Sequence, residues 1–295
     1  MPDLTIDAFY TDQFDANWQH LVQQSDGRAH ARVRQESVTG KRKLLNFIGK
    51  SKARLITTRS GKTIPSNTPL AKRKLSLRAF DEVYHEDEWD AELLGEVTSP
   101  RSAVVAAHAK AFQRSMDEAV LTAALGSAYV GEDGTEEVVL PSTQKVGVSF
   151  GSANSGLTLA KLIQARSILG ANEADGEPLL LFYAQKQLDN LLLNVTQVSS
   201  ADYASVKALV EGKVTHFMGF EFIKTQLLPL DTATNVRSCV AMAASGVAFA
   251  KNGMNTKIIV RDDLNETLQI RTKARYGATR TEEEKVVEIA CDEDA

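Results

Sequence analysis

Hydrophobic and polar residues alternate along this chain with two periods, one typical of helices and one typical of strands. The stretch 99–126 has the helical period, which predicts one long amphipathic helix. Ser99 is a good N-cap, Pro100 suits the first helical turn, and Gly126 is a natural stop. One face of this helix is formed by an i, i+4 row of Val104, His108, Phe112, Met116 and Val120. We therefore expect His108 to be a hydrogen-bonded core residue.

Shorter helices and strands interleave irregularly through the rest of the chain, so the predicted fold class is α+β. Helices are expected at 157–169, 185–194 and 202–211, the first with Leu159, Leu162, Ile163 and Leu169 facing inward. The continuous apolar run 178–184 predicts a buried central strand. Alternation or apolar character predicts further strands at 217–225, 239–243, 257–262, 267–276 and 286–290.

Residues 53–80 have the pattern of a long hairpin. Residues 55–58 and 75–79 are strand-like, and the stretch between them is rich in turn-forming residues: Gly61, Pro65, Asn67 and Pro69. The hairpin has too many charges and too few large apolar residues to be buried against a core. It is therefore expected to project, and an isolated two-stranded ribbon needs a partner surface.

Charge is distributed very unevenly. From Arg28 to Arg78 there are 15 Lys or Arg residues and one Glu, whereas the whole chain has a net charge of −4. The stretch from Asp81 to Glu96 holds eight acids and no Lys or Arg. Such a chain can attract itself, within one copy or between copies. Only Phe47 among the aromatic residues falls in the basic segment, which disfavours base stacking but leaves nonspecific nucleic-acid binding as an alternative.

Motifs for catalysis or metal binding are lacking. The Gly-Lys-Thr triplet at 61–63 lacks the earlier glycine of a phosphate-binding loop, and Pro65 prevents a helix from following. Cys239 and Cys291 form no CxxC pair, and the five histidines have no metal-ligand spacing. We expect no enzyme activity, cofactor or metal. The N-terminus lacks the pattern of a signal peptide, and no run is long and apolar enough for a membrane helix, so no membrane partner is expected.

The order of these elements resembles the major capsid protein of tailed bacteriophages, which has the Hong Kong 97-type fold. The resemblance is carried first by residues 71–126, with their basic strand, acidic link around Trp89 and Ser99-Pro100, and the Arg-Ser-Met-Asp step at 114–117. These features look like those of podovirus-type capsid proteins. Residues 201–225, with Gly219-Phe220, and the later Leu228-Pro229 form the second patch.

The resemblance implies a division of the chain. Residues 1–50 would be an N-terminal arm, and 51–84 a long hairpin called the E-loop. Residues 85–149 would form a peripheral domain with spine helix 99–126, and 150–245 an axial domain. The C-terminal strands in 246–295 would return to the peripheral domain.

The resemblance also implies a function: self-assembly into the pentamers and hexamers of an icosahedral head that encloses double-stranded DNA. The protein would be part of the virion and would assemble in the host cytoplasm. Its expected partners are further copies of itself, a separate scaffolding protein, a portal protein, a decoration or cement protein, and packaged DNA through nonspecific contacts. The alternatives are the shell of an encapsulin-like compartment and a nonspecific nucleic-acid-binding protein.

In this interpretation the basic hairpin clamps an acidic surface of the adjacent subunit. Its expected contact residues are Arg54, Arg59, Lys62, Lys72, Arg73, Lys74 and Arg78. The candidate acidic partner surface is Glu86, Asp87, Glu88, Asp90 and Glu92.

Overall fold

The computed structural model describes residues 23–24, 26–55, 57–59, 61–62, 65, 68–86, 101–151, 154–195, 216–264 and 266–294. The α-helices of this part of the chain are α2 (Arg101–Leu125), α3 (Leu159–Ala171) and α4 (Gln185–Val195). The strands before α3 are β1 (Arg34–Glu36), β2 (Arg42–Ile48), β3 (Leu70–Ser76), β4 (Arg78–Glu86), β5 (Ala128–Val130), β6 (Glu136–Val138) and β7 (Lys145–Val146). The later strands are β8 (Leu179–Tyr183), β9 (His216–Phe217), β10 (Phe220–Lys224), β11 (Leu230–Asp231), β12 (Val236–Ala243), β13 (Val247–Arg261), β14 (Thr267–Arg280) and β15 (Val286–Asp292).

A seven-stranded sheet forms the core of one half of the molecule, in the order β7-β15-β12-β8-β10-β9 with β11 paired to β12. All five residues of β8 are buried, and β8 lies between parallel β10 and antiparallel β12. The predicted central strand is therefore confirmed. Continuous apolar character is what a strand needs when both faces of its sheet are covered.

Helix α3 packs on this sheet through part of the predicted set of residues. Leu162 and Leu169 are buried as predicted, together with Lys161 and Ala165, whereas Ile163 is 51% exposed. The Lys161 ammonium turns inward because the carbonyl oxygens of Ser155 and Ala290 accept from it at 2.7 and 2.8 Å. A buried cation with carbonyl partners thus takes the place expected for an apolar side chain.

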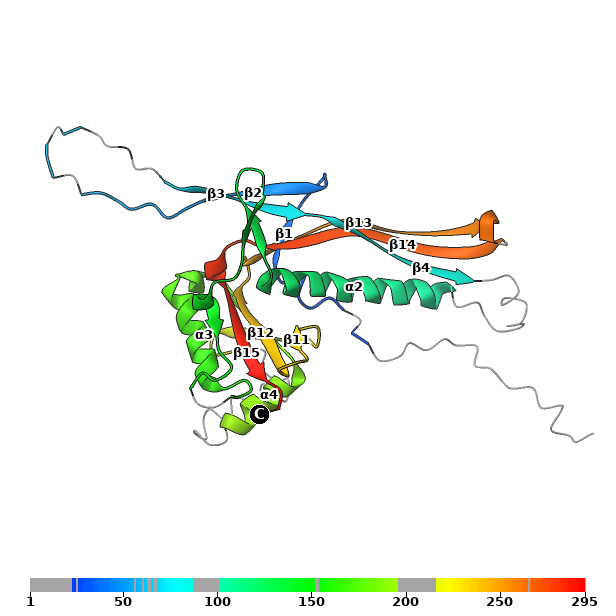
Figure 1. The fold of residues 1–295 in the computed structure, drawn as a ribbon. Coiled ribbons are helices and arrows are strands. Elements are labelled where there is room, and N and C mark those ends of the chain that lie inside the picture. The colour runs from blue at the N-terminus through cyan, green and yellow to red at the C-terminus, as the bar shows by residue number, and fades with distance from the viewer. Residues whose placement is uncertain are drawn as a thin grey trace, which may run out of the picture.

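The second half is a long twisted ribbon with α2 lying along it (Figure 1). Its strand order is β1-β13-β14-β4. Helix α2 has 25 residues, a length of about 38 Å at 1.5 Å per residue. Its buried row packs on β14, where the ring of Tyr276 stacks on Phe80 at 4.2 Å and meets Phe112 edge-on at 6.4 Å. His108 is buried, with Nδ1 3.2 Å from the Thr272 hydroxyl, which confirms the predicted core histidine.

A third sheet, β2-β3-β5-β6, carries the projecting hairpin. The predicted strand at 55–58 was wrong, because the strand that pairs antiparallel with β3 is β2, from Arg42↔Ser76 to Ile48↔Leu70. The other predicted strand, 75–79, spans the end of β3 and the start of β4. Leu55, Thr57 and Thr58 lie outside any strand. The described residues between Ile48 and Leu70 form the projecting loop, which extends away from both halves in Figure 1.

Other predicted strands have different bounds in the structure. The segment 217–225 is a tight hairpin of β9 and β10, because Met218 and Gly219 have φ values of 52° and 82° that turn the chain. β13 begins ten residues before the predicted strand 257–262 and ends at Arg261, while β14 continues four residues beyond 267–276, and both strands lie over α2. β15 departs from the expected return of 246–295 to the helix-bearing half, since it pairs with β12 in the seven-stranded sheet.

Some predicted features lie outside the described residues. These are the N-terminal part of the arm, the acidic run from Asp87 onward, the capping residues Ser99 and Pro100, and the helix 202–211. No helix of the described chain is long and apolar enough to cross a membrane.

Candidate inter-subunit surfaces

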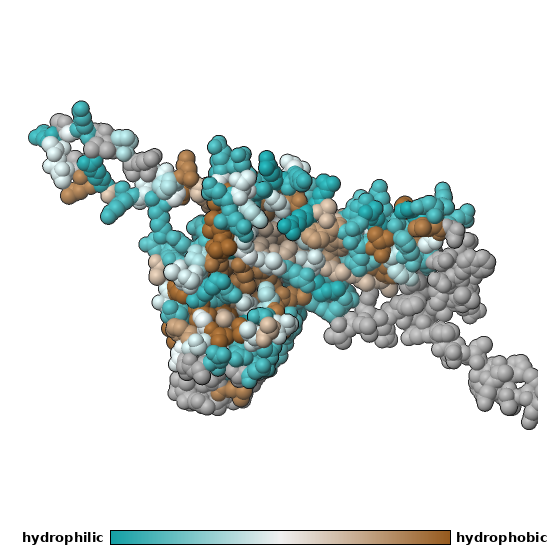
Figure 2. All heavy atoms as spheres, in the orientation of Figure 1, coloured by the Kyte–Doolittle hydropathy of each residue, from teal (hydrophilic) through white to brown (hydrophobic). Residues whose placement is uncertain are grey.

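The projecting loop carries both cations and apolar side chains, and both kinds are exposed. Within the described residues, Arg54, Arg59 and Lys62 make no ion pair. Leu55 is 82% exposed, while Ile48 and Leu70 at the two ends of the loop are 78% and 79% exposed. In the space-filling view the loop stands clear of the other elements (Figure 2). Exposed apolar area is stabilised only when it leaves water, so this loop gains from a partner surface.

The cations at the base of the hairpin have partners within their own chain. Arg73 is 8% exposed, and its Nη2 donates to Glu283 Oε2 at 2.5 Å. Lys74 Nζ donates to the carbonyl of Gly134 at 3.1 Å and lies 5.7 Å from the centre of the Tyr129 ring. These two cations hold the hairpin to the molecule, a role that the sequence analysis missed. Lys72 is half-buried in the same strand.

Arg73, Glu283 and Arg280 form a buried charge cluster at the junction of the three sheets. Arg280 is fully buried, and its guanidinium donates to the carbonyls of Ala124 and Gly126 at 3.1 and 2.5 Å, which satisfies the end of α2. Glu283 Oε1 lies 3.6 Å from Arg280 Nη2. Burial lowers the pKa of Arg280, and the Glu283 carboxylate opposes this effect. One carboxylate thus joins the hairpin base to the helix end.

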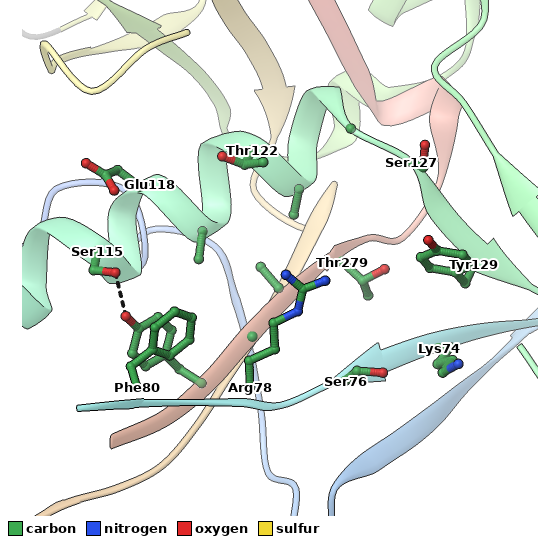
Figure 3. A pocket seen from close by; sticks show the side chains of 16 residues that line it. Lys74, Ser76, Arg78, Phe80, Ser115, Glu118, Thr122, Ser127, Tyr129 and Thr279 are labelled. Atoms are coloured by element: carbon green, nitrogen blue, oxygen red, sulfur yellow. Dashed lines mark hydrogen bonds between the residues drawn. The ribbon is translucent and has the colours of Figure 1, made fainter. Parts of the chain in front are cut away.

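A groove of about 520 Å³ lies between the C-terminal half of α2 and strands β3, β4 and β14 (Figure 3). Arg78 extends into it from the start of β4, and no ion pair of Arg78 occurs within the described residues. Along the floor, the Tyr276 hydroxyl donates to Ser115 Oγ at 2.6 Å. A Cβ on Gly277 would lie 2.1 Å from the carbonyl oxygen of Ser76, so these backbones can cross only because Gly277 has no side chain.

The predicted acidic partner surface is only partly described. Glu86 ends β4 and is buried, with 4% of its surface exposed. The other predicted acids, Asp87, Glu88, Asp90 and Glu92, lie outside the described residues. The structure shows a second acidic segment that the sequence analysis did not name as a partner surface. It comprises the turn after β5 and the start of β6, with exposed Glu132, Asp133, Glu136 and Glu137. The sequence carried a signal for this acidic segment, because four acids fall within six positions.

Asp117 anchors the beginning of the described chain to α2. Its carboxylate is fully buried and accepts from the backbone N–H groups of Arg28, Ala29 and His30 at 2.7, 3.0 and 2.9 Å. His30 Nδ1 lies 2.7 Å from it, and Gln24 Nε2 donates to it at 2.8 Å. Burial would raise the pKa of Asp117, but the hydrogen bonds from His30 and the three N–H groups outweigh it and lower the pKa.

The neighbouring helix residue Arg114 also contacts this segment. Its Nη1 donates to Gln23 Oε1 at 2.5 Å. Arg114 and Asp117 therefore bind the same segment from adjacent turns of α2.

The described residues contain no group of three or more His, Cys, Asp or Glu side chains that could hold a metal ion. Cys239 and Cys291 are free and buried. A hydrogen bond with Cys291 and burial raise the pKa of the Cys239 thiol well above its ordinary value, so the thiolate needed for reaction is disfavoured.

The sequence matches the model of the phage capsid protein family over residues 6–293. This chain belongs to the phage capsid protein family. No curated protein matches it significantly. The solved head of Helicobacter pylori bacteriophage KHP40 is similar, with a TM-score of 0.70 at 10% identity over 99% of this chain and 98% of that chain. The capsid of Ralstonia phage GP4 gives 0.69 at 9% identity over 96% and 95%. The capsid of cyanophage P-SCSP1u gives 0.66 at 14% identity over 96% and 93%.

The fold of this capsid protein is therefore of the Hong Kong 97 type, and its function is that of a major capsid protein, a structural component of the virion. Neither the compartment shell nor the nucleic-acid-binding alternative is favoured. The exposed cations of the projecting loop lie on a part of the molecule that extends away from both of its halves (Figure 1).

Proposed function

We propose that copies of this capsid protein form pentamers and hexamers that close into an icosahedral head around double-stranded DNA. The observation that carries the proposal is the projecting loop, which has exposed apolar and cationic side chains and no core of its own. A segment of this kind gains little stability in a single copy. When many copies interlock, each loop is covered by a neighbour, and the contacts reinforce one another.

The loop is proposed to clamp an acidic surface of the adjacent subunit. Arg54, Arg59 and Lys62 supply the cations, because they are exposed and make no ion pair within the described chain. Lys72 and Arg78 extend the same surface toward the base of the hairpin. The acidic counterpart in this proposal is the run that starts at the end of β4: Glu86, Asp87, Glu88, Asp90 and Glu92.

The structure changes which charges should be tested. Reversal of Arg73 would separate the hairpin from Glu283, and reversal of Lys74 would remove its bond to Gly134, so both changes would disturb the subunit itself. The exposed tip can be altered without that cost. The test is the triple variant Arg54→Glu, Arg59→Glu and Lys62→Glu, with the charge-preserving triple variant Arg54→Lys, Arg59→Lys and Lys62→Arg as its control.

Electron microscopy and analytical sedimentation of the purified proteins measure the outcome. With lysate from an infected host added to each sample, we expect closed shells from the wild type and the charge-preserving control, and folded subunits without shells from the charge-reversed variant. Normal shells from the charge-reversed variant would refute the clamp. If no variant, including the wild type, forms particles while the wild type binds DNA in a strongly salt-dependent way, the protein is a nucleic-acid binder instead.

The remaining partners follow from the same proposal. Assembly in the host cytoplasm would use a separate scaffolding protein and a portal protein, and a decoration or cement protein could cover the finished shell. Contact with packaged DNA would be nonspecific. Addition of lysate from an infected host tests the scaffold requirement, since shells would then form only when lysate is present.

A further inference from the structure

The face of the long ribbon that lies opposite α2 is strongly basic. On β14, Thr272 and Tyr276 point toward α2 through their hydrogen bonds to His108 and Ser115. Side chains alternate along a strand, so Arg271, Lys273 and Arg275 point away from the helix. The register of the paired strands places Lys257 of β13 directly opposite Arg271.

This basic face, which we define as Lys257, Arg271, Lys273 and Arg275, has too few carboxylates of its own. Arg271 is bound by Asp81 of β4. Lys257, Lys273 and Arg275 are exposed and have no ion pair within the residues that the structure describes. Like charges directly opposite each other destabilise a sheet. Binding of an acidic partner segment would therefore stabilise the basic face.

The basic face is also hollowed. A depression of about 630 Å³ is lined by backbone and side chains of β4, β13 and β14, including Asp81, Lys273 and Arg275. The cause is an irregularity in β13, where the register shifts between Asn252 and Met254 and Gly253 has a φ of 60°. Figure 2 shows hydrophilic side chains interspersed with hydrophobic ones over the ribbon. A small protruding segment of another molecule would fit such a surface.

The same chain presents a segment of that description at another place. The acidic turn, which we define as residues 131–137, comprises the turn after β5 and the first two residues of β6, and has exposed Glu132, Asp133, Glu136 and Glu137. Within the described chain none of these carboxylates has a cation partner. The turn is held in place because Lys74 Nζ donates to the Gly134 carbonyl and because β5 pairs with β3. It is therefore a fixed protrusion with four unpaired negative charges.

Within one copy the two surfaces do not meet. The acidic turn lies at the base of the projecting hairpin, whereas the basic face follows the ribbon toward its far end (Figure 1). We infer that the basic face of one capsid protein receives the acidic turn of a neighbouring copy. This inference rests on the proposed shell function and adds a second contact to it. The projecting loop is excluded as the occupant because its own cations would be repelled.

The contact is heterologous, since it joins two different patches of identical subunits. Contacts of this kind form rings when the rotation between subunits closes, which is what pentamers and hexamers require. Complementary charges also set the register of association and accelerate it. The acidic turn and the projecting loop would then bind different surfaces of a neighbouring copy.

The test is a charge swap. One variant carries Lys273→Glu and Arg275→Glu, a second carries Glu136→Lys and Glu137→Lys, and a third combines all four changes. The variant Lys273→Arg with Arg275→Lys is the charge-preserving control. All four positions are exposed, so unfolding temperatures close to that of the wild type are expected for every variant.

We expect each reversed variant to raise the protein concentration needed for particle formation by at least about tenfold, and the combined variant to return it close to the wild-type value. The charge-preserving control should match the wild type. Wild-type behaviour of both reversed variants would overturn the inference. So would reversed variants that fail to assemble and are not rescued by combination. Particle formation by the wild type in the same experiment reports separately on the proposed shell function.

Discussion

At the scale of single residues, the segment 28–30 is held by one carboxylate. Asp117 accepts three backbone N–H groups from it and contacts the His30 ring, and all of these contacts are buried or nearly so. A helix residue that satisfies donors almost ninety positions earlier in the chain works as a long-range cap. The consequence is that residues 28–30 have a fixed position on α2.

We expect Asp117→Asn to lower the free energy of unfolding by about 3 kcal/mol, because the amide nitrogen cannot accept and buried N–H groups lose their partner. Chemical denaturation at neutral pH measures this loss. Glu118→Gln is the matched control, since Glu118 is the exposed neighbour on the same helix. Equal stability of the Asp117 and Glu118 variants would show that the anchor contributes little.

The difference in unfolding free energy between the wild type and Asp117→Asn should also depend on pH. The folded-state pKa of Asp117 lies below its ordinary value of 3.8, so the unfolded chain binds the proton more readily. The contribution of Asp117 is thus complete above about pH 5 and is lost as the pH falls through the folded-state pKa. The difference in unfolding free energy between wild type and Asp117→Asn should shrink between pH 5 and pH 3. A difference that grows over this range would contradict the assignment.

Sequence patterns could not have revealed this anchor. Asp117 directly follows Met116, which belongs to the predicted apolar row. A lone carboxylate beside such a row indicates the solvent-facing side of a helix. Its partners are backbone groups, which leave no trace in side-chain identity. The same reason explains Lys161, which was not placed in the core because the carbonyls that accept from it belong to distant segments. By contrast, His108 was predicted correctly, since the row around it is apolar.

At the scale of elements, prediction succeeded where burial alone sets the pattern. β8 and α2 were found because continuous or periodic apolar residues follow directly from covered surfaces. β2 was missed because it is a half-exposed strand with two cations, held by backbone pairing to β3 and by only one buried side chain, Leu45. The sequence analysis treated the candidate cations of the hairpin as one contact surface, and the sequence could not divide them into the exposed tip and the base that binds Glu283.

The position of the hairpin on the ribbon depends on a close crossing at Gly277. A Cβ at this position would lie 2.1 Å from the Ser76 carbonyl oxygen, and both partners are backbone, so the strands must separate. We expect Gly277→Ala to cost about 1–3 kcal/mol of stability and to speed hydrogen exchange of β3 amides. Thermal unfolding and exchange measured by mass spectrometry provide the two readouts.

Gly147→Ala is the control for this change, because an added Cβ at Gly147 meets nothing within 4 Å. It should leave stability unchanged or raise it slightly, since alanine restricts the unfolded chain. If both variants unfold at the wild-type temperature, the crossing is looser than the structure indicates.

At the scale of the whole molecule, stability and assembly are separated in space. The main hydrophobic core joins the seven-stranded sheet to α2, and a small second cluster, which includes Leu45, Leu75 and Leu77, holds the base of the hairpin. The projecting loop belongs to neither cluster. A molecule arranged in this way can lose the loop without unfolding, while its neighbours lose a contact.

This separation predicts that a subunit without the projecting loop stays folded and blocks the assembly of wild-type subunits mixed with it. The N–H of Gly49 donates to the Pro69 carbonyl at 2.8 Å, so residues 50–68 can be replaced by a two-residue Asn-Gly turn that keeps β2 and β3 paired. The shortened chain should unfold within a few degrees of the wild type and form no shells alone.

Mixed with an equal amount of wild type, the shortened chain can still receive a neighbour's loop but offers none in return. It should therefore enter growing shells and stop them, and the yield of closed particles in sedimentation should fall by far more than half. A yield that only halves would mean that the shortened chain stays outside the shell, and closed shells from the shortened chain alone would show that the loop is not the clamp.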